Sequence, residues 1–160
     1  MKKIISLCFV CVLFSLLFLP TNTVYADDSC VAKAMAVYEG NSGTLLYQKN
    51  AYDHLAIAST TKIITCIVAI ENYDDLEREV VVSDKAVGIE GTSIYLKHGE
   101  KIRFKDLLYG LMLASGNDCA VAIAEEVAGV DVFVQMMNEY AVNCGANNTH
   151  FVNPHGLDDD

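Results

Sequence analysis

The chain has 160 residues, of which 52% are hydrophobic, so it can build a packed core and does not have a disordered composition. The formal net charge of −10 argues against nucleic acid or an anionic lipid surface as a partner, because like charges repel. The length suits one small domain or part of a larger one.

The first residues are typical of a secretory signal peptide. Lys2 and Lys3 precede an apolar run over residues 4–19, Pro20 breaks that run, and Val24-Tyr25-Ala26 offers compact residues for cleavage. The run is shorter than the ~18 residues expected of a membrane-spanning helix, so an uncleaved anchor is the weaker alternative. We therefore expect residues 1–26 to be removed after Ala26 and the protein to be exported.

Export bears on the four cysteines that remain, Cys30, Cys66, Cys119 and Cys144. An oxidising compartment permits disulfides, and four cysteines allow three complete pairings. Cys66 and Cys119 lie in apolar helical patterns, however, where a free thiol packs as a small hydrophobe. The sequence leaves both alternatives open. Neither a Cys-x-x-Cys motif nor a histidine pair at ligand spacing occurs, so no metal site is expected.

Secondary structure is predicted from the spacing of apolar and turn-forming residues. Strands are expected near residues 31–39 and 44–48, joined as a hairpin by Gly40-Asn41-Ser42-Gly43. Residues 52–58 connect this hairpin to a helix from Ser59 to about Asn72, which is apolar on every face and is therefore expected to be buried. Short strands are expected at residues 79–82 and 93–96, and Lys97-His98-Gly99 is expected to form a turn.

Three helices should follow in close succession. Apolar residues recur at helical spacing from Phe104 to Met112. A second helix is expected to be capped by Asn117 or Asp118 and to stop at Gly129, and a third to run from Asp131 to Gly145.

Ser59 and Lys62 form a candidate nucleophile and base. Residues three apart share one face of a helix, so the lysine amine can reach the serine hydroxyl. A buried helix would desolvate Lys62 and favour its neutral amine, which can take a proton from Ser59. The unpaired N–H groups of the first turn would stabilise an oxyanion. A serine that starts a helix is also a common N-cap, so the tetrad alone leaves a structural interpretation open.

Ser115-Gly116-Asn117 falls on the tight link between two predicted helices. There a hydroxyl could relay a proton to a leaving amine, and a carboxamide could hydrogen-bond both a substrate amide and Lys62. The structural alternative is a capping turn, with Gly116 at the bend and Asn117 as N-cap.

Together, the two motifs resemble the penicillin-recognising serine transferases, whose signature is Ser-x-x-Lys, then Ser-x-Asn, then Lys-Thr-Gly. The chain is most similar to the low-molecular-mass penicillin-binding proteins that act as D-alanyl-D-alanine carboxypeptidases. The segments that carry the resemblance are residues 56–62 (AIASTTK), 91–97 (GTSIYLK), 106–118 (DLLYGLMLASGND) and 153–157 (NPHGL).

The resemblance implies an α+β fold of the serine β-lactamase and DD-peptidase type, with an antiparallel sheet packed with helices and a helical subdomain. It implies that Ser59 is the acyl-enzyme nucleophile, Lys62 its base, Ser115 a proton relay and Asn117 a substrate-binding residue. The implied reaction removes the terminal D-alanine from peptidoglycan stem peptides outside the cytoplasm, without a cofactor, and β-lactams would acylate the same serine.

One part of the signature is missing, since no Lys-Thr-Gly follows Ser115. Residues 27–160 are therefore expected to be the N-terminal part of a catalytic domain, truncated before the third motif. Alternatives that use the same residues are a DD-endopeptidase and a β-lactamase, and a further alternative is an inactive penicillin- or peptidoglycan-binding fragment. A C-terminal segment after Asp160 would be the means of any association with the membrane surface.

Overall fold

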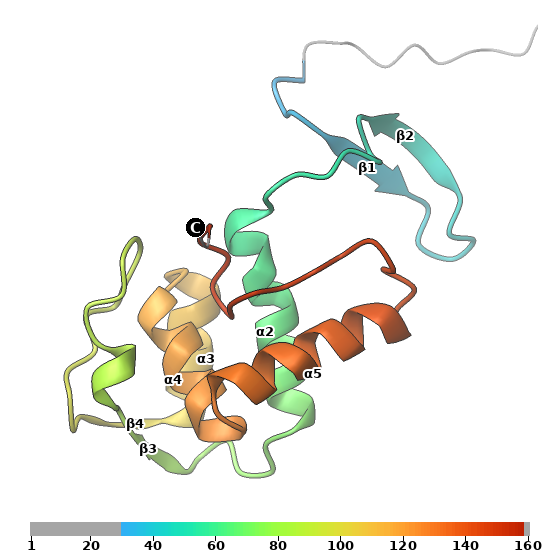
Figure 1. Ribbon diagram of the computed structural model, residues 1–160. Coiled ribbons are helices and arrows are strands. Elements are labelled where there is room, and N and C mark those ends of the chain that lie inside the picture. Colours follow the sequence, from blue (N-terminus) through green and yellow to red (C-terminus); the bar gives the residue numbers. More distant parts are fainter. Residues whose placement is uncertain (1–29, 159–160) are drawn as a thin grey trace, which may run out of the picture. The chain divides into compact units, whose positions relative to one another are not determined.

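The chain divides after His54 into two compact parts in the computed structural model, which describes residues 30–158 (Figure 1). The signal peptide expected over residues 1–26 lies outside the described residues. No helix within residues 30–158 has both the length and the apolar character needed to cross a membrane.

The first part is the predicted hairpin, with a shorter first strand and a second strand shifted by one residue. β1 (Met35–Tyr38) pairs antiparallel with β2 (Leu45–Lys49), and a bulge follows Val37. The turn is fastened by the Glu39 carboxylate, which accepts hydrogen bonds from the backbone N–H groups of Asn41 and Ser42. The hydrogen bonds from Ser42 lower the pKa of Glu39 to about 2.

The helix predicted from Ser59 begins differently from the expectation. Ala58–Thr60 form a 3₁₀ turn, and α2 (Thr61–Glu71) starts after it. The helix is also not buried on every face, since Ile63 and Ile70 are each 50% exposed while Val68 is buried. An apolar run without a period gives the amount of apolar surface but not the face that neighbouring elements cover.

The second part also holds a small antiparallel ladder. β3 (Glu79–Val81) was predicted, and it pairs with β4 (Lys101–Arg103), which was missed because charges flank its one apolar residue. The expected turn at residues 97–99 is present, with Gly99 at φ +74°.

The strand predicted at residues 93–96 is wrong. This segment is a loop in which Tyr95 has φ +63°, and its N–H groups turn toward the Asp118 carboxylate instead of a neighbouring strand. The β-forming residues Ile94 and Tyr95 were misleading because a buried carboxylate competes with a ladder for the same backbone donors.

The three predicted helices are confirmed as α3 (Phe104–Leu113), α4 (Asn117–Val127) and α5 (Val130–Asn143). Their caps differ from the prediction. Gly116 and Gly129 occupy the N-cap positions, and neither provides a capping side chain. Asp118 is a buried residue inside α4 and not its cap.

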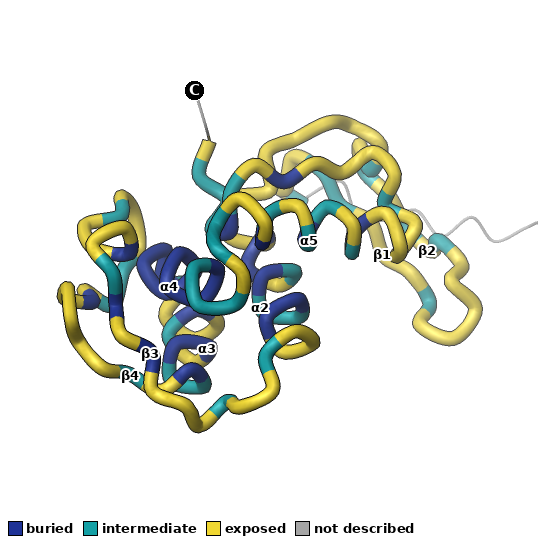
Figure 2. The backbone as a smooth tube through the Cα atoms, turned by 60° about the horizontal axis from the view of Figure 1, so that its bottom comes forward, coloured by how far each residue is buried: buried dark blue, intermediate teal, exposed yellow. Residues whose placement is uncertain are grey.

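The core is organised around α4, whose first eight residues, Asn117–Ala124, are all buried (Figure 2). Alanines at 120, 122 and 124 let α2, α3 and α5 approach it closely. Phe104 on α3 stacks on Tyr73, with ring centroids 3.9 Å apart. All four described cysteines are free thiols, and Cys119 is buried in this core.

After α5, residues 144–158 run back along the helix and reach the start of α2 (Figure 1). The Asn138 carboxamide holds this segment by donating to the Phe151 carbonyl and accepting from the Phe151 N–H, each at 2.8 Å. The Thr65 hydroxyl donates to the Pro154 carbonyl at 2.7 Å. These contacts bring a segment distant in sequence against the turn that carries Ser59.

Candidate active site

Ser59 lies exposed in the 3₁₀ turn that leads into α2. The residue before it, Ala58, has φ +46°, an unfavourable backbone conformation for a residue with a Cβ atom. The Thr60 hydroxyl donates to the Ile57 carbonyl at 2.6 Å and closes the turn. Since strain of this kind persists only where the surroundings enforce it, the turn presents Ser59 in a fixed position.

Lys62 lies one turn further along and is only 3% exposed. Its Nζ donates to Ser59 Oγ and to the His155 carbonyl, both at 3.0 Å. Burial lowers the pKa of Lys62 below its ordinary value, because an ammonium loses its hydration there. The predicted contact and the predicted direction of the shift are therefore both present.

Ser115 comes from the link between α3 and α4. Its Oγ donates to Ser59 Oγ at 3.0 Å, so two side chains converge on one hydroxyl. Ser115 has φ +57°, whereas Gly116 has φ −65°. The unusual backbone conformation expected at Gly116 is therefore found at Ser115. The bend is stabilised by a hydrogen bond from the Gly116 N–H to the Gly110 carbonyl at 3.1 Å.

Asn117 is buried beside this group but faces a different partner from the one expected. Its Nδ2 donates to the Glu90 carbonyl at 2.6 Å, and its backbone N–H donates to the Thr92 carbonyl at 2.7 Å. No hydrogen bond between Asn117 and Lys62 occurs among the described residues. Gly91 leaves room for the carboxamide, because a Cβ there would lie 2.8 Å from Nδ2.

Backbone strain is concentrated around these residues. Four non-glycine residues of the described chain have positive φ, and two of them, Ala58 and Ser115, flank the Ser59 hydroxyl from opposite elements. A third, Tyr95, lies in the segment that contacts the start of α4. Strain of this kind is typical of functional sites, where geometry takes precedence over stability.

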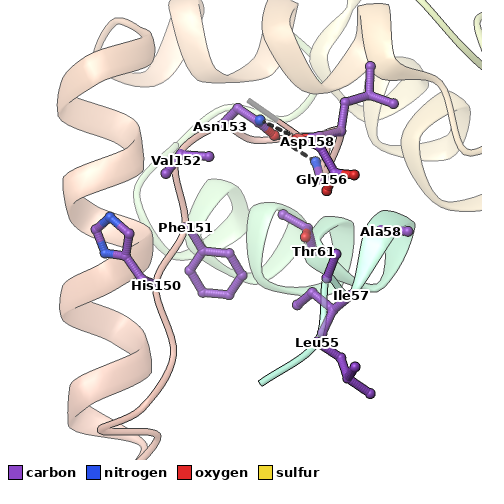
Figure 3. Close-up of a pocket in the computed structure, with 12 residues that line it drawn as sticks. Leu55, Ile57, Ala58, Thr61, His150, Phe151, Val152, Asn153, Gly156 and Asp158 are labelled. Carbon is purple, nitrogen blue, oxygen red and sulfur yellow. Dashed lines mark hydrogen bonds between the residues drawn. The ribbon is translucent and has the colours of Figure 1, made fainter. Parts of the chain in front are cut away.

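The sequence indicated the 153–157 segment only as part of the family resemblance, and no role was predicted for its individual residues. The Asn153 Oδ1 accepts the Gly156 N–H at 2.7 Å, and its Nδ2 donates to the Leu157 carbonyl at 2.8 Å (Figure 3). This turn aims the His155 carbonyl at Lys62. Gly156 has φ +83°, and a Cβ there would lie 2.0 Å from the Ala58 carbonyl oxygen. The Asn-Pro-x-Gly spacing is a turn signal that could have indicated the arrangement.

A cavity of about 370 Å³ lies next to this turn (Figure 3). It is lined by residues 55–58, Thr61 and residues 150–153 and 156–158 of the returning segment, and Ser59, Lys62 and Ser115 are not among its lining residues. The converging hydroxyl and amine groups therefore face a different region from the cavity. No group of three or more metal-ligating side chains occurs within residues 30–158.

Comparison with known proteins decides the family. The profile of the D-alanyl-D-alanine carboxypeptidase family matches residues 21–160. The chain belongs to this family. It is 40% identical over 131 residues to the D-alanyl-D-alanine carboxypeptidase DacF of Bacillus subtilis (strain 168), covering 79% of this chain and 34% of that protein.

Solved structures support the same assignment and confirm the predicted α+β fold. A D-alanyl-D-alanine carboxypeptidase from Mycobacterium tuberculosis matches with a TM-score of 0.81 and 34% identity, over 88% of this chain and 52% of that one. A mutant of a Streptomyces DD-transpeptidase matches with a TM-score of 0.77 and 30% identity, over 83% and 56%. The chain thus spans about a third to a half of the length of these relatives.

Replacing Gly156 with alanine tests how tightly the 153–157 segment is seated on the Ser59 turn. Gly129 is a matched control, because it has the same φ of +83° while the place that its Cβ would take has no described atom within 4 Å. We expect Gly129→Ala to lower the free energy of unfolding by ~1–2 kcal/mol through strain alone. Gly156→Ala should cost about 1–3 kcal/mol more, through the clash. Equal losses in urea denaturation would contradict the close contact.

Proposed function

We propose that the full-length protein is a serine-type D-alanyl-D-alanine carboxypeptidase that acts through an acyl-enzyme on Ser59. The observation that carries the proposal is the convergence of Lys62 Nζ and Ser115 Oγ on Ser59 Oγ, each at 3.0 Å, in a chain of this family. Because the chain covers 34% of its Bacillus relative, the activity is proposed for the whole gene product.

The first half of the proposed reaction is acylation. Ser59 Oγ attacks the carbonyl carbon of the penultimate D-alanine, and the neutral amine of Lys62 takes the hydroxyl proton. The lowered pKa of Lys62 favours this neutral form, and the His155 carbonyl orients the amine. As the C–N bond breaks, Ser115 gives its hydroxyl proton to the nitrogen of the departing D-alanine and receives in its place the proton that Lys62 took, so that serine and amine both return to their neutral forms. The backbone N–H of Ser59 forms part of the oxyanion hole, and Asn117 positions the substrate amide.

The second half transfers the acyl group to an acceptor. Water gives hydrolysis and a stem peptide shortened by one D-alanine. An amine acceptor would give a new peptide bond, and a similar solved structure is described as a DD-transpeptidase, which favours this as the second candidate. A DD-endopeptidase and a β-lactamase would use the same residues and differ in the substrate that is cleaved.

β-Lactams are the second class of ligand in this proposal, as covalent acylating inhibitors of Ser59. The proposal also places the enzyme outside the cytoplasm, at the cell wall or at the outer face of the membrane, where its peptidoglycan substrate lies.

Labelling with a fluorescent penicillin tests the acylation step. We expect the full-length wild-type protein to be labelled stoichiometrically, and Ser59→Ala to remain unlabelled. Ser83→Ala is a control for substitution of a serine outside this group of residues and should be labelled normally. An unlabelled wild type, or label retained in Ser59→Ala, would refute the mechanism. Free D-alanine, cleaved cross-links or a new peptide bond would then identify the reaction.

The role of Lys62 predicts a distinctive pH dependence. Acylation needs the neutral amine, so the acylation rate should rise with pH and then reach a plateau. The apparent pKa of this rise should lie below the ordinary lysine value of 10.5. Lys62→Arg stays protonated and should lose about 10²–10⁴-fold in acylation rate. Lys97→Arg, at an exposed position, should behave as wild type. A rate independent of pH up to 10.5 would argue against Lys62 as the base.

Export is tested by N-terminal sequencing of the protein from culture. We expect the mature chain to begin at Asp27, after cleavage behind Ala26. Recovery of an intact Met1 terminus from the extracytoplasmic fraction would contradict a cleaved signal peptide.

A further inference from the structure

Asp118 is a charged side chain in the middle of the protein core. It is 0% exposed, and its carboxylate accepts hydrogen bonds from four donors. These are the Ser93 hydroxyl at 2.6 Å and the N–H groups of Ile94 at 3.1 Å, Leu96 at 3.0 Å and Cys119 at 2.9 Å. Three of the four come from one loop, so the carboxylate joins that loop to the first turn of α4.

The loop is shaped to supply these donors. The N–H groups of Ile94 and Leu96 would not converge on one side-chain acceptor in a regular strand, where backbone donors are paired with a neighbouring strand. The φ of +63° at Tyr95 turns the backbone so that both reach the same carboxylate, and the Tyr95 N–H donates to Ser93 Oγ at 3.0 Å. A buried charge is tolerated only when it is fully hydrogen-bonded, so loop and carboxylate depend on each other.

The same loop also holds the residue before Asp118. The Thr92 carbonyl accepts the Asn117 N–H, and the Glu90 carbonyl accepts the Asn117 carboxamide. The 90–96 segment is therefore hydrogen-bonded to α4 at two consecutive residues, Asn117 and Asp118. Ser115 lies two residues before Asn117, in a strained conformation with φ +57°. The fixed start of α4 therefore restrains Ser115 from one side, and the hydrogen bond from the Gly116 N–H to the Gly110 carbonyl restrains it from the other.

We propose that Asp118 is a positioning residue of this site, whose carboxylate anchors the 90–96 segment to α4 and thereby keeps Ser115 Oγ within hydrogen-bonding distance of Ser59 Oγ. Asp118 does not touch Ser59, and it acts through Ser115 and Asn117. This inference rests on the proposed function, because it assigns Asp118 to the same acyl-transfer site.

Asp118→Asn is the direct test, since the side chain keeps its shape but turns an N–H₂ group toward backbone donors. We expect it to slow acylation of the full-length protein by a fluorescent penicillin by about 10–100-fold, with the non-covalent binding constant changed by less than about threefold. Ser93→Ala removes one donor, keeps the carboxylate and should slow acylation by about three- to tenfold. Asp131→Asn is the matched control, an aspartate in the first turn of α5 outside the core that should match the wild type.

A double-mutant cycle separates positioning from a general loss of stability. If Asp118 acts through Ser115, then Ser115→Ala/Asp118→Asn should acylate within about twofold of Ser115→Ala alone. Fully multiplicative effects would overturn the proposal. If Asp118→Asn fails to give a cooperative melting transition, the cycle of Ser93→Ala with Ser115→Ala decides by the same criterion.

The two proposals fail in different ways. A wild-type protein that is not labelled at Ser59 refutes the proposed function, and the role of Asp118 with it. A labelled wild type together with an Asp118→Asn variant that acylates within about twofold of it refutes the positioning role alone.

Discussion

The burial of the Lys62 amine is the constraint on which the rest of the second part depends. Lys62 as a whole residue is 3% exposed, so its amine has lost hydration, and nearby acceptors must compensate for that loss. One acceptor, Ser59 Oγ, is local. The other, the His155 carbonyl, lies 93 residues away in sequence. The chain must therefore return from α5 to the start of α2 before Lys62 can be accommodated.

That return explains features that otherwise look unrelated. The Thr65 hydroxyl donates to the Pro154 carbonyl, and the Asn153 side chain accepts the Gly156 N–H in the turn that follows. A Cβ at position 156 would clash with the Ala58 carbonyl, so a glycine is needed there. Each of these contacts brings the His155 carbonyl closer to Lys62. Ala58, with its strained φ of +46°, lies at the same close approach, because its carbonyl oxygen would be 2.0 Å from a Cβ on Gly156.

The sequence predicted the contact between Ser59 and Lys62 better than it predicted the segments that support these residues. Ser59 and Lys62 could be paired because helical spacing fixes which side chains are neighbours, and α3, α4 and α5 followed from apolar periodicity. The segments 90–96 and 153–157 could not be placed in the same way. Their hydrogen bonds go from backbone groups to side chains far along the chain, and such contacts leave no period in the sequence. Asp118 shows the difficulty: at the start of a helix a cap is the usual role of aspartate, and only the fold reveals that loop donors surround it.

The site therefore has two halves with separate supports, which meet at one atom. Lys62 is held by the returning segment through a backbone carbonyl, whereas Ser115 is held by the link between α3 and α4, which the 90–96 segment braces. The two hydrogen bonds to Ser59 Oγ are thus set by independent parts of the structure. This separation suits a mechanism in which one group takes a proton and the other delivers one, because each group can be tuned by its own surroundings. Burial lowers the pKa of Lys62, while Ser115, at a positive φ in the link between α3 and α4, donates to Ser59 from the other side.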